Sequence, residues 1–108
     1  MSKSARIREL NDAFRRTFVG GQVMLTAGVN ALSDAEKAAV LAKVRTFDAF
    51  NSDNVPHGEH DFVSIEHGIE KYFGKLDYYA PDMQAGSEDP ADPSQTIRVL
   101  TVMRADEY

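Results

Sequence analysis

The sequence predicts an α+β domain with a mostly antiparallel sheet of about five strands and two helices packed on one face. Apolar residues recur at helical spacing near the N-terminus, and short β-branched and aromatic runs fill the second half. The helical segments precede most of the expected strands. The 108 residues suit a single domain spanning the whole chain, and an apolar content of 43% suits a folded one.

The N-terminal segment predicts a helix over residues 4–17. Its apolar residues form one stripe: Ile7, Leu10, Phe14 and Phe18. Ser2 or Ser4 can cap the start of this helix, and Gly20-Gly21 is expected to end it, because glycine readily reaches the left-handed conformation. The Arg residues lie mainly off the apolar stripe, so we expect a basic helix face in contact with solvent.

A strand over residues 22–26 and a second helix are expected next. Ser33 and Glu36 form a capping box, in which each side chain accepts a hydrogen bond from an unpaired amide at the helix start. The Ala-rich run that follows predicts a helix over residues 34–43. Residues 44–50 carry aromatics three apart and β-branched neighbours, which indicates a strand.

The second half of the chain predicts a hairpin. Residues 61–66 and 69–73 flank His67-Gly68, and glycine supplies the positive φ of a tight turn. The second arm is expected to continue to Tyr79, with Gly74 as a bulge. Alternation places Tyr72 and Tyr78 on one face of this arm, and Phe73 and Tyr79 on the other. One set should pack in the core, and the other would suit a binding surface.

Residues 97–103 form the most apolar expected strand. Both of its faces are apolar around Leu100, which predicts a central place in the sheet. The preceding loop, residues 80–95, is long for so small a domain, and long loops are usually functional or disordered. Asp89-Pro90 and Asp92-Pro93 favour turns there, since the residue before proline is displaced from helical geometry.

Composition excludes several classes of function. The chain has no cysteine, so disulfides, thiolate zinc sites and cysteine nucleophiles are ruled out. Neither an N-terminal signal region nor an apolar run of membrane-spanning length is visible, so we expect a cytoplasmic protein that does not bind membranes. No P-loop and no nucleophile elbow is present in the sequence.

The net charge of −5 is unevenly distributed. Residues 1–16 hold five basic and two acidic residues, whereas residues 77–108 hold seven acidic and two basic ones. Direct nucleic-acid binding needs clustered Lys and Arg to displace counterions, so the overall acidity argues against it. A protein partner with a basic surface is the better expectation.

Two stretches of the sequence bear a family resemblance. The first runs from Phe47-Asp48-Ala49-Phe50-Asn51 through Asp53-Asn54 and Pro56 to Gly58-Glu59-His60-Asp61-Phe62. The second comprises Lys75-Leu76-Asp77-Tyr78-Tyr79, Ser87-Glu88-Asp89-Pro90-Ala91-Asp92-Pro93 and Arg98-Val99-Leu100-Thr101-Val102-Met103. With these motifs the chain resembles the bacterial family named domain of unknown function 3768, over most of its length beyond the first helix.

The resemblance implies a small protein of alphaproteobacteria and of their plasmids or phages, and it implies no assigned activity. Members of the family often carry an acidic residue at the position of Val55 and a Trp before the motif that begins at Lys75. This chain has Tyr72-Phe73-Gly74 before that motif. A function that used the acidic side chain is therefore not implied here.

The stretch His57-Gly58-Glu59-His60-Asp61 is the densest in chemical groups. On an extended strand His57, Glu59 and Asp61 point one way and His60 the other, and His67 and Asp77 could join from the neighbouring strand. A metal site needs ligands that converge on one point. The alternative, which we favour, is a polar turn leading into a strand, and we expect no metal or other cofactor.

A carboxylate cluster is a second candidate site. Asp77, Asp89 and Asp92 would meet Glu59 if the long loop folded back on the hairpin, and carboxylates can hold Mg²⁺ or Ca²⁺ or transfer protons. The alternative, again favoured, is that Asp89 and Asp92 only form turns before proline.

Two functional hypotheses remain. The first is a non-catalytic protein-binding or regulatory module, an inhibitor of host defence on a mobile element being one such role. Its expected binding residues are Glu59, His60, Asp61, Asp77, Tyr78, Tyr79, Glu88, Asp89 and Asp92. The second is a metal-dependent, hydrolase-like enzyme that uses His57–Asp61. An exposed strand edge would also allow a homodimer.

Overall fold

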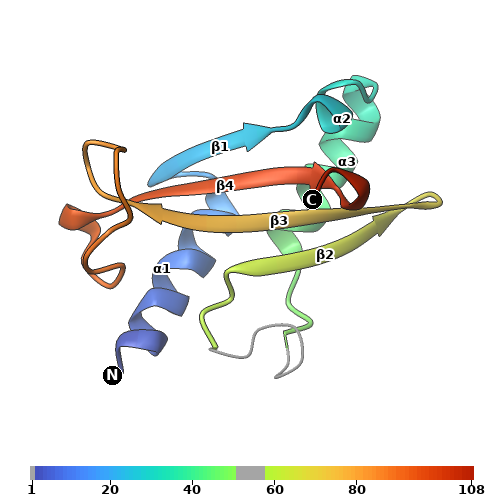
Figure 1. Ribbon diagram of the computed structural model, residues 1–108. Coiled ribbons are helices and arrows are strands. Elements are labelled where there is room, and N and C mark those ends of the chain that lie inside the picture. Colours follow the sequence, from blue (N-terminus) through green and yellow to red (C-terminus); the bar gives the residue numbers. More distant parts are fainter. Residues whose placement is uncertain (1, 51–57) are drawn as a thin grey trace.

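The computed structural model describes residues 2–50 and 58–108 and shows a four-stranded sheet with helices on one side (Figure 1). The strands are β1 (Gly21–Leu25), β2 (Phe62–His67), β3 (Glu70–Tyr79) and β4 (Ile97–Arg104). Their order in the sheet is β1-β4-β3-β2; β1 runs parallel to β4, and the other two pairings are antiparallel. The predicted α+β class with a mostly antiparallel sheet is confirmed, with four strands instead of about five.

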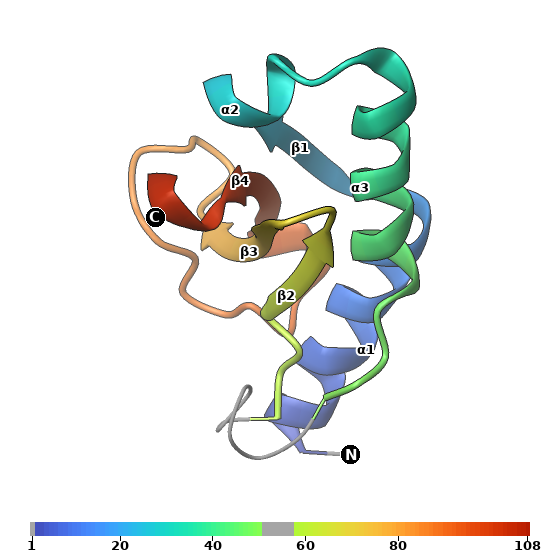
Figure 2. The same ribbon diagram turned by 90° about the vertical axis from the view of Figure 1, so that its right-hand side faces the viewer.

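Three helices and two 3₁₀ turns complete the described part of the chain. They are α1 (Lys3–Thr17), α2 (Ala27–Asn30), α3 (Asp34–Thr46), η1 (Pro93–Gln95) and η2 (Ala105–Glu107). Figure 2 shows α1 and α3 together on one side of the sheet, as the sequence predicts. Among these residues no helix is both long and apolar enough to cross a membrane.

Both ends of helix α1 are capped by hydrogen bonds. The hydroxyl of Ser2 accepts from the N–H of Ala5, as the N-cap prediction requires. The left-handed residue after the helix is Phe18, at φ 59°, and not Gly20 or Gly21 as the glycine pair suggests. Gly21 instead allows the Phe14 ring to pack closely against the backbone, because a Cβ at this position would lie 2.8 Å from that ring.

Helix α3 is longer than the sequence predicts. The Ser33 hydroxyl accepts from the N–H of Glu36, as expected, but the helix continues to Thr46. The predicted strand over residues 44–50 is therefore wrong. Val44 extends the buried stripe of Val40 by one helical turn, and that packing outweighs its β-branched preference.

The hairpin forms where the sequence predicts it, with Gly68 at φ +64° in its turn. The predicted bulge at Gly74 is wrong, because the pairing of β3 is continuous on both of its sides. Gly74 instead provides a close approach: a Cβ there would lie 2.8 Å from Val63 and 3.2 Å from Val44. Helix α3 can thus pack directly on the middle of β3.

Strand β4 lies between β1 and β3, which confirms the predicted central place of residues 97–103. The core lies between this sheet and the two long helices. Its buried members are Phe14, Val29, Val40, Val44, Val63, Ile65, Tyr72, Leu76, Leu100 and Val102. On the opposite face of the sheet the 3₁₀ turn η2 leads to Tyr108, which packs against Phe62 and Phe73.

Candidate functional site

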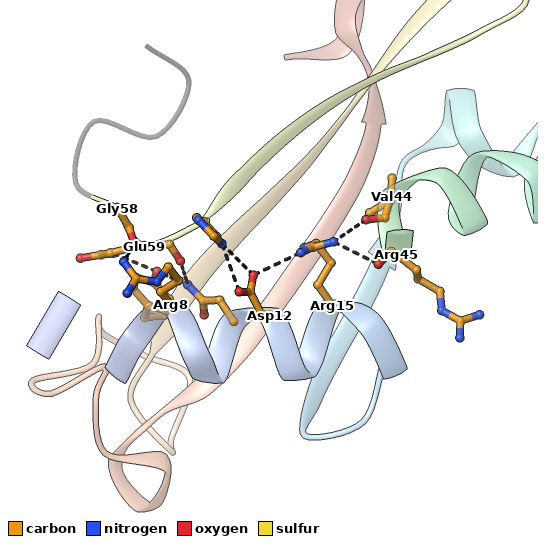
Figure 3. Close-up of polar contacts among 10 residues, drawn as sticks. Arg8, Asp12, Arg15, Val44, Arg45, Gly58 and Glu59 are labelled. Atoms are coloured by element: carbon orange, nitrogen blue, oxygen red, sulfur yellow. Dashed lines mark hydrogen bonds and ion pairs between the residues drawn. The ribbon is translucent and has the colours of Figure 1, made fainter. Parts of the chain in front are cut away.

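One side of α1 carries polar residues that point toward the rest of the molecule (Figure 3). Asn11, Asp12 and Arg15 follow Arg8 by three, four and seven positions, so they lie on the same side of the helix as Arg8. The Arg8 guanidinium donates to the carbonyl of Gly58 at 3.1 Å. The N-terminal end of this polar face of α1 therefore contacts the segment that leads into β2.

Asn11 is the centre of the first cluster. It is fully buried, and its amide nitrogen donates to the Tyr78 hydroxyl at 2.8 Å and to the carbonyl of Glu59 at 3.0 Å. Its oxygen accepts from Nε of Arg98 at 2.8 Å. Tyr78 in turn donates to the Glu59 carboxylate at 3.0 Å. These four residues connect α1, β3, β4 and the segment before β2.

The chemistry of this cluster is that of a structural hydrogen-bond network. Burial raises the pKa of Tyr78 well above its ordinary value, so the phenol stays protonated and acts as a donor, not as a nucleophile. Burial also lowers the pKa of the Arg98 guanidinium from its ordinary value. Arg98 lies 4% exposed, with its guanidinium 5.3 Å from the centre of the Tyr78 ring.

Asp12 and His60 form the second cluster. The Nδ1 atom of His60 lies 2.9 and 3.1 Å from the two carboxylate oxygens of Asp12. An ionised carboxylate only accepts, so Nδ1 of His60 donates to Asp12; in the neutral form of the imidazole the lone pair is then on Nε2. The imidazole also stacks on Phe50, with ring centres 3.7 Å apart.

Arg15 extends this cluster to α3. Its guanidinium donates to the carbonyls of Val44 and Arg45 at 3.0 and 3.1 Å, and to the Asp12 carboxylate at 3.2 Å. It is 0% exposed, and burial is the main cause that lowers its pKa. The expected solvent-facing basic helix is therefore wrong for Arg15, whereas the neighbouring Arg16 is exposed.

The loop of residues 80–96, called the acidic loop below, is ordered by its own polar side chains. Asp89 accepts from the N–H of Ala91, and Asp92 accepts from the N–H and hydroxyl of Ser94. Both Asp residues thus serve as the predicted turn formers. Ser87 and Thr96 meet at 2.7 Å and join the middle of the loop to its C-terminal end.

The carboxylates of the acidic loop differ in their surroundings. Asp89 lies 3.6 Å from the amino group of Lys3, at the start of α1. Asp82 and Glu88 are exposed and line a shallow hollow of about 330 Å³ on the loop. No Lys or Arg occurs between residues 76 and 97. In Figure 1 the loop lies at the end of the sheet where β3 ends and β4 begins.

Asp77 and Tyr79 lie on the face of the sheet opposite to α1, α3 and Tyr78, as alternation along β3 requires. The Asp77 carboxylate lies 3.5 Å from the amino group of Lys75. Asp61 continues the pairing of β2, because its carbonyl accepts from the N–H of Leu76 at 2.9 Å. The nine predicted binding residues are therefore divided between the two faces of the sheet and the acidic loop.

The residues named above as the alternative metal site do not meet as a group within the described part of the chain. In that part of the chain no three His, Asp or Glu side chains are placed to hold one metal ion. Glu59 is hydrogen-bonded to Tyr78, His60 to Asp12, and Asp77 faces the other side of the sheet. His57 and Val55 lie outside the described residues.

Sequence reasoning missed Asn11, Asp12, Arg15 and Arg98. A signal for two of them was present, since Asn11 and Arg15 fall on the same helical stripe as Ile7, Phe14 and Phe18. A polar residue within an apolar stripe indicates a buried hydrogen-bond partner. The sequence does not indicate which distant segment supplies that partner.

A family model described as a protein of unknown function, DUF3768, matches residues 25–107. The chain belongs to the DUF3768 family. No curated protein and no solved structure matches it. The matched region includes Glu59, His60, Tyr78 and Arg98, whereas α1 lies before it. The network described above therefore joins the DUF3768 region to the preceding helix.

Proposed function

We propose that this member of the DUF3768 family is a non-catalytic protein-binding module whose acidic loop recognises a basic surface of a protein partner. The proposal depends on one observation: the acidic loop has no basic residue and is held in shape at its turns by Asp89, Asp92 and Ser87. An ordered loop loses little conformational entropy on binding.

Charge and position support this proposal. Asp82 and Glu88 are exposed and line the same hollow of the loop, where a cationic side chain of a partner would find two carboxylates. A surface of this kind suits the basic nucleic-acid-binding cleft of a host enzyme, since such a cleft neutralises phosphates. Together with the mobile-element association that the family resemblance implies, this favours an inhibitor of host defence.

A matched pair of charge reversals tests the proposal. Glu88→Lys and Glu66→Lys change the net charge equally, and both glutamates are exposed, with no side-chain hydrogen bond to the described residues. Glu88 lies on the acidic loop, and Glu66 lies on β2. We expect a partner captured from host lysate by the wild-type protein to bind Glu88→Lys about tenfold or more weakly, and Glu66→Lys normally.

Two results would count against the binding module. The first is that the wild-type protein retrieves no specific partner from host lysate, which would remove the main support for a binding module. Equal loss of binding in Glu88→Lys and Glu66→Lys would show that net charge, and not the acidic loop, attracts the partner. Binding that weakens as salt is raised is a further expectation, because charges at the rim of an interface are screened.

The Asp12–His60 contact favours a second candidate function, a metal-dependent hydrolase that uses residues 57–61. Metal-binding histidines commonly donate their other ring nitrogen to a carboxylate, as Nδ1 of His60 does to Asp12. Elemental analysis of the purified protein and thermal shifts with Zn²⁺, Mn²⁺ and Mg²⁺ test it. This function requires a thermal shift with one of these metal ions that is lost in His60→Ala. The shift should remain in His67→Ala, which changes a histidine at the end of β2.

A further inference from the structure

A small pocket lies between α1 and the chain around η1. Its volume is about 170 Å³. Five apolar side chains line it: Leu10, Ala13, Phe14, Val19 and Pro93. Gly20 and Thr96 complete the wall together with Arg98, and the Thr96 hydroxyl already donates to the carbonyl of Asp89. Arg98 is the one charged residue among the described wall residues, so the pocket joins a mainly hydrocarbon surface to a single cation.

Arg98 forms no direct ion pair within the described residues, and the carboxylate whose charge acts on it, Glu59, is hydrogen-bonded to Tyr78. Its Nε donates to the amide oxygen of Asn11, and its Nη2 donates to the carbonyl of Pro90. The Tyr78 ring is its third contact. All three partners are neutral, and Nη1 makes no hydrogen bond to the described part of the chain. A guanidinium has five N–H donors, and a charge this deeply buried is normally paired.

We propose that this pocket binds a small monocarboxylate with an apolar body, whose carboxylate pairs with Arg98. The body would lie against Leu10, Ala13 and Phe14, where it buries hydrocarbon. One negative charge matches the one cation, whereas a phosphate dianion would leave uncompensated charge among apolar walls. The pocket volume is on the order of six water-sized groups, which suits a ligand with a short hydrocarbon chain.

This inference is independent of the acidic-loop proposal, because the pocket and the hollow of the loop share no wall side chain. Glu88→Lys should therefore leave carboxylate binding unchanged. In the same way, a ligand in the pocket gives no reason to expect a changed affinity for a basic partner. Each proposal can fail without the other.

The first experiment compares head groups on one chain length. Hexanoate, hexan-1-ol and hexylamine are titrated into the full-length protein while the Nε–H resonance of Arg98 is followed by NMR. We expect hexanoate to shift that resonance in a saturable way. Hexan-1-ol should bind about tenfold more weakly or worse, because it cannot form a charge-assisted hydrogen bond with Arg98. Hexylamine should not bind, because its charge has the wrong sign. Butyrate and octanoate then give the preferred chain length.

The second experiment blocks the pocket without altering Arg98. Ala13 is an exposed residue of α1 that lines the pocket, so Ala13→Phe fills the space while the fold is kept. Ala38→Phe on α3 is the matched control. The proposal requires hexanoate binding to be lost in Ala13→Phe and kept in Ala38→Phe. The proposal is overturned if hexanoate leaves the Arg98 resonance unmoved. It is also overturned if the wild-type protein binds hexylamine as tightly as hexanoate, or if Ala13→Phe binds hexanoate as tightly as the wild-type protein does.

Discussion

The amide oxygen of Asn11 accepts a hydrogen bond of 2.8 Å from Nε of Arg98, a residue 87 positions later in the chain. The two residues come from α1 and from the central strand β4, and both are almost fully buried. The same Asn11 side chain donates to Tyr78 and to the Glu59 carbonyl. One amide thus satisfies three partners on elements that are distant in sequence.

Asn11→Leu should therefore destabilise the protein strongly. The change removes the acceptor of Arg98 Nε and the donor to the Glu59 carbonyl and to the Tyr78 hydroxyl. The cost is about 1–3 kcal/mol for each buried group that stays unsatisfied. We expect the free energy of unfolding in urea to fall by about 3 kcal/mol or more. Glu9→Ala, on the exposed side of the same helix, should change it by less than about 0.5 kcal/mol. Equal effects of the two changes would refute a special role for Asn11.

Arg15 and Arg16 are adjacent arginines with different expected contributions. Arg15 is buried and donates to the carbonyls of Val44 and Arg45 at the end of α3, whereas the side chain of Arg16 is exposed. Arg15→Met should lower the free energy of unfolding by about 2–4 kcal/mol, because two helix carbonyls lose the Arg15 donor and Asp12 keeps only His60. Arg16→Met should cost less than about 0.5 kcal/mol. Urea unfolding of both variants checks this, and the reverse order would mean that the burial of Arg15 has no energetic role.

Gly74 and Gly86 allow a test of the close packing of α3 on the sheet. A Cβ at Gly74 would lie 2.8 Å from Val63, whereas a Cβ at Gly86 would have the Tyr78 carbonyl at 3.8 Å, an ordinary contact. Gly74→Ala should cost about 1–3 kcal/mol through overpacking, and Gly86→Ala should be nearly neutral. Adding Val63→Ala to Gly74→Ala should recover part of the loss, since it removes the clashing methyl groups. Thermal melting of the four proteins decides the matter, and no recovery in the double variant would contradict this explanation.

Glu107 gives a prediction about pH. Its carboxylate accepts from the Thr26 hydroxyl and from the N–H groups of Arg104 and Gly28, and these bonds lower its pKa in that order. A lowered pKa stabilises the fold above the unfolded value of about 4.3, and the effect is lost as the pH falls through the folded pKa.

The variant Glu107→Gln should therefore be less stable than the wild-type protein at pH 7, with a difference that shrinks as the pH approaches about 3. Urea midpoints measured across this range provide the test. Glu88→Gln is the control, because no backbone N–H of the described residues donates to its side chain. A difference between Glu107→Gln and wild type that stays constant with pH would show that the contacts of Glu107 do not depend on its charge.

Local patterns in the sequence were enough to predict much of the fold. The stripe of α1, the Ser2 and Ser33 caps, and the Gly68 turn depend on neighbours within a few residues, so a single sequence contains them. The alternation of β3 and the apolar character of β4 likewise depend only on which face each residue occupies. The turns at Asp89 and Asp92 were predictable for the same reason.

Only the tertiary structure decided the rest. The β-branched Val44 and the two phenylalanines after it suggested a strand, and helix packing of Val44 against the sheet decided otherwise. The inward placement of Asn11 and Arg15 depends on acceptors and donors from α3, β3 and β4, which no local pattern specifies. Burying a polar group is favourable only when a distant segment supplies its partner, and the sequence alone does not show which segment that is.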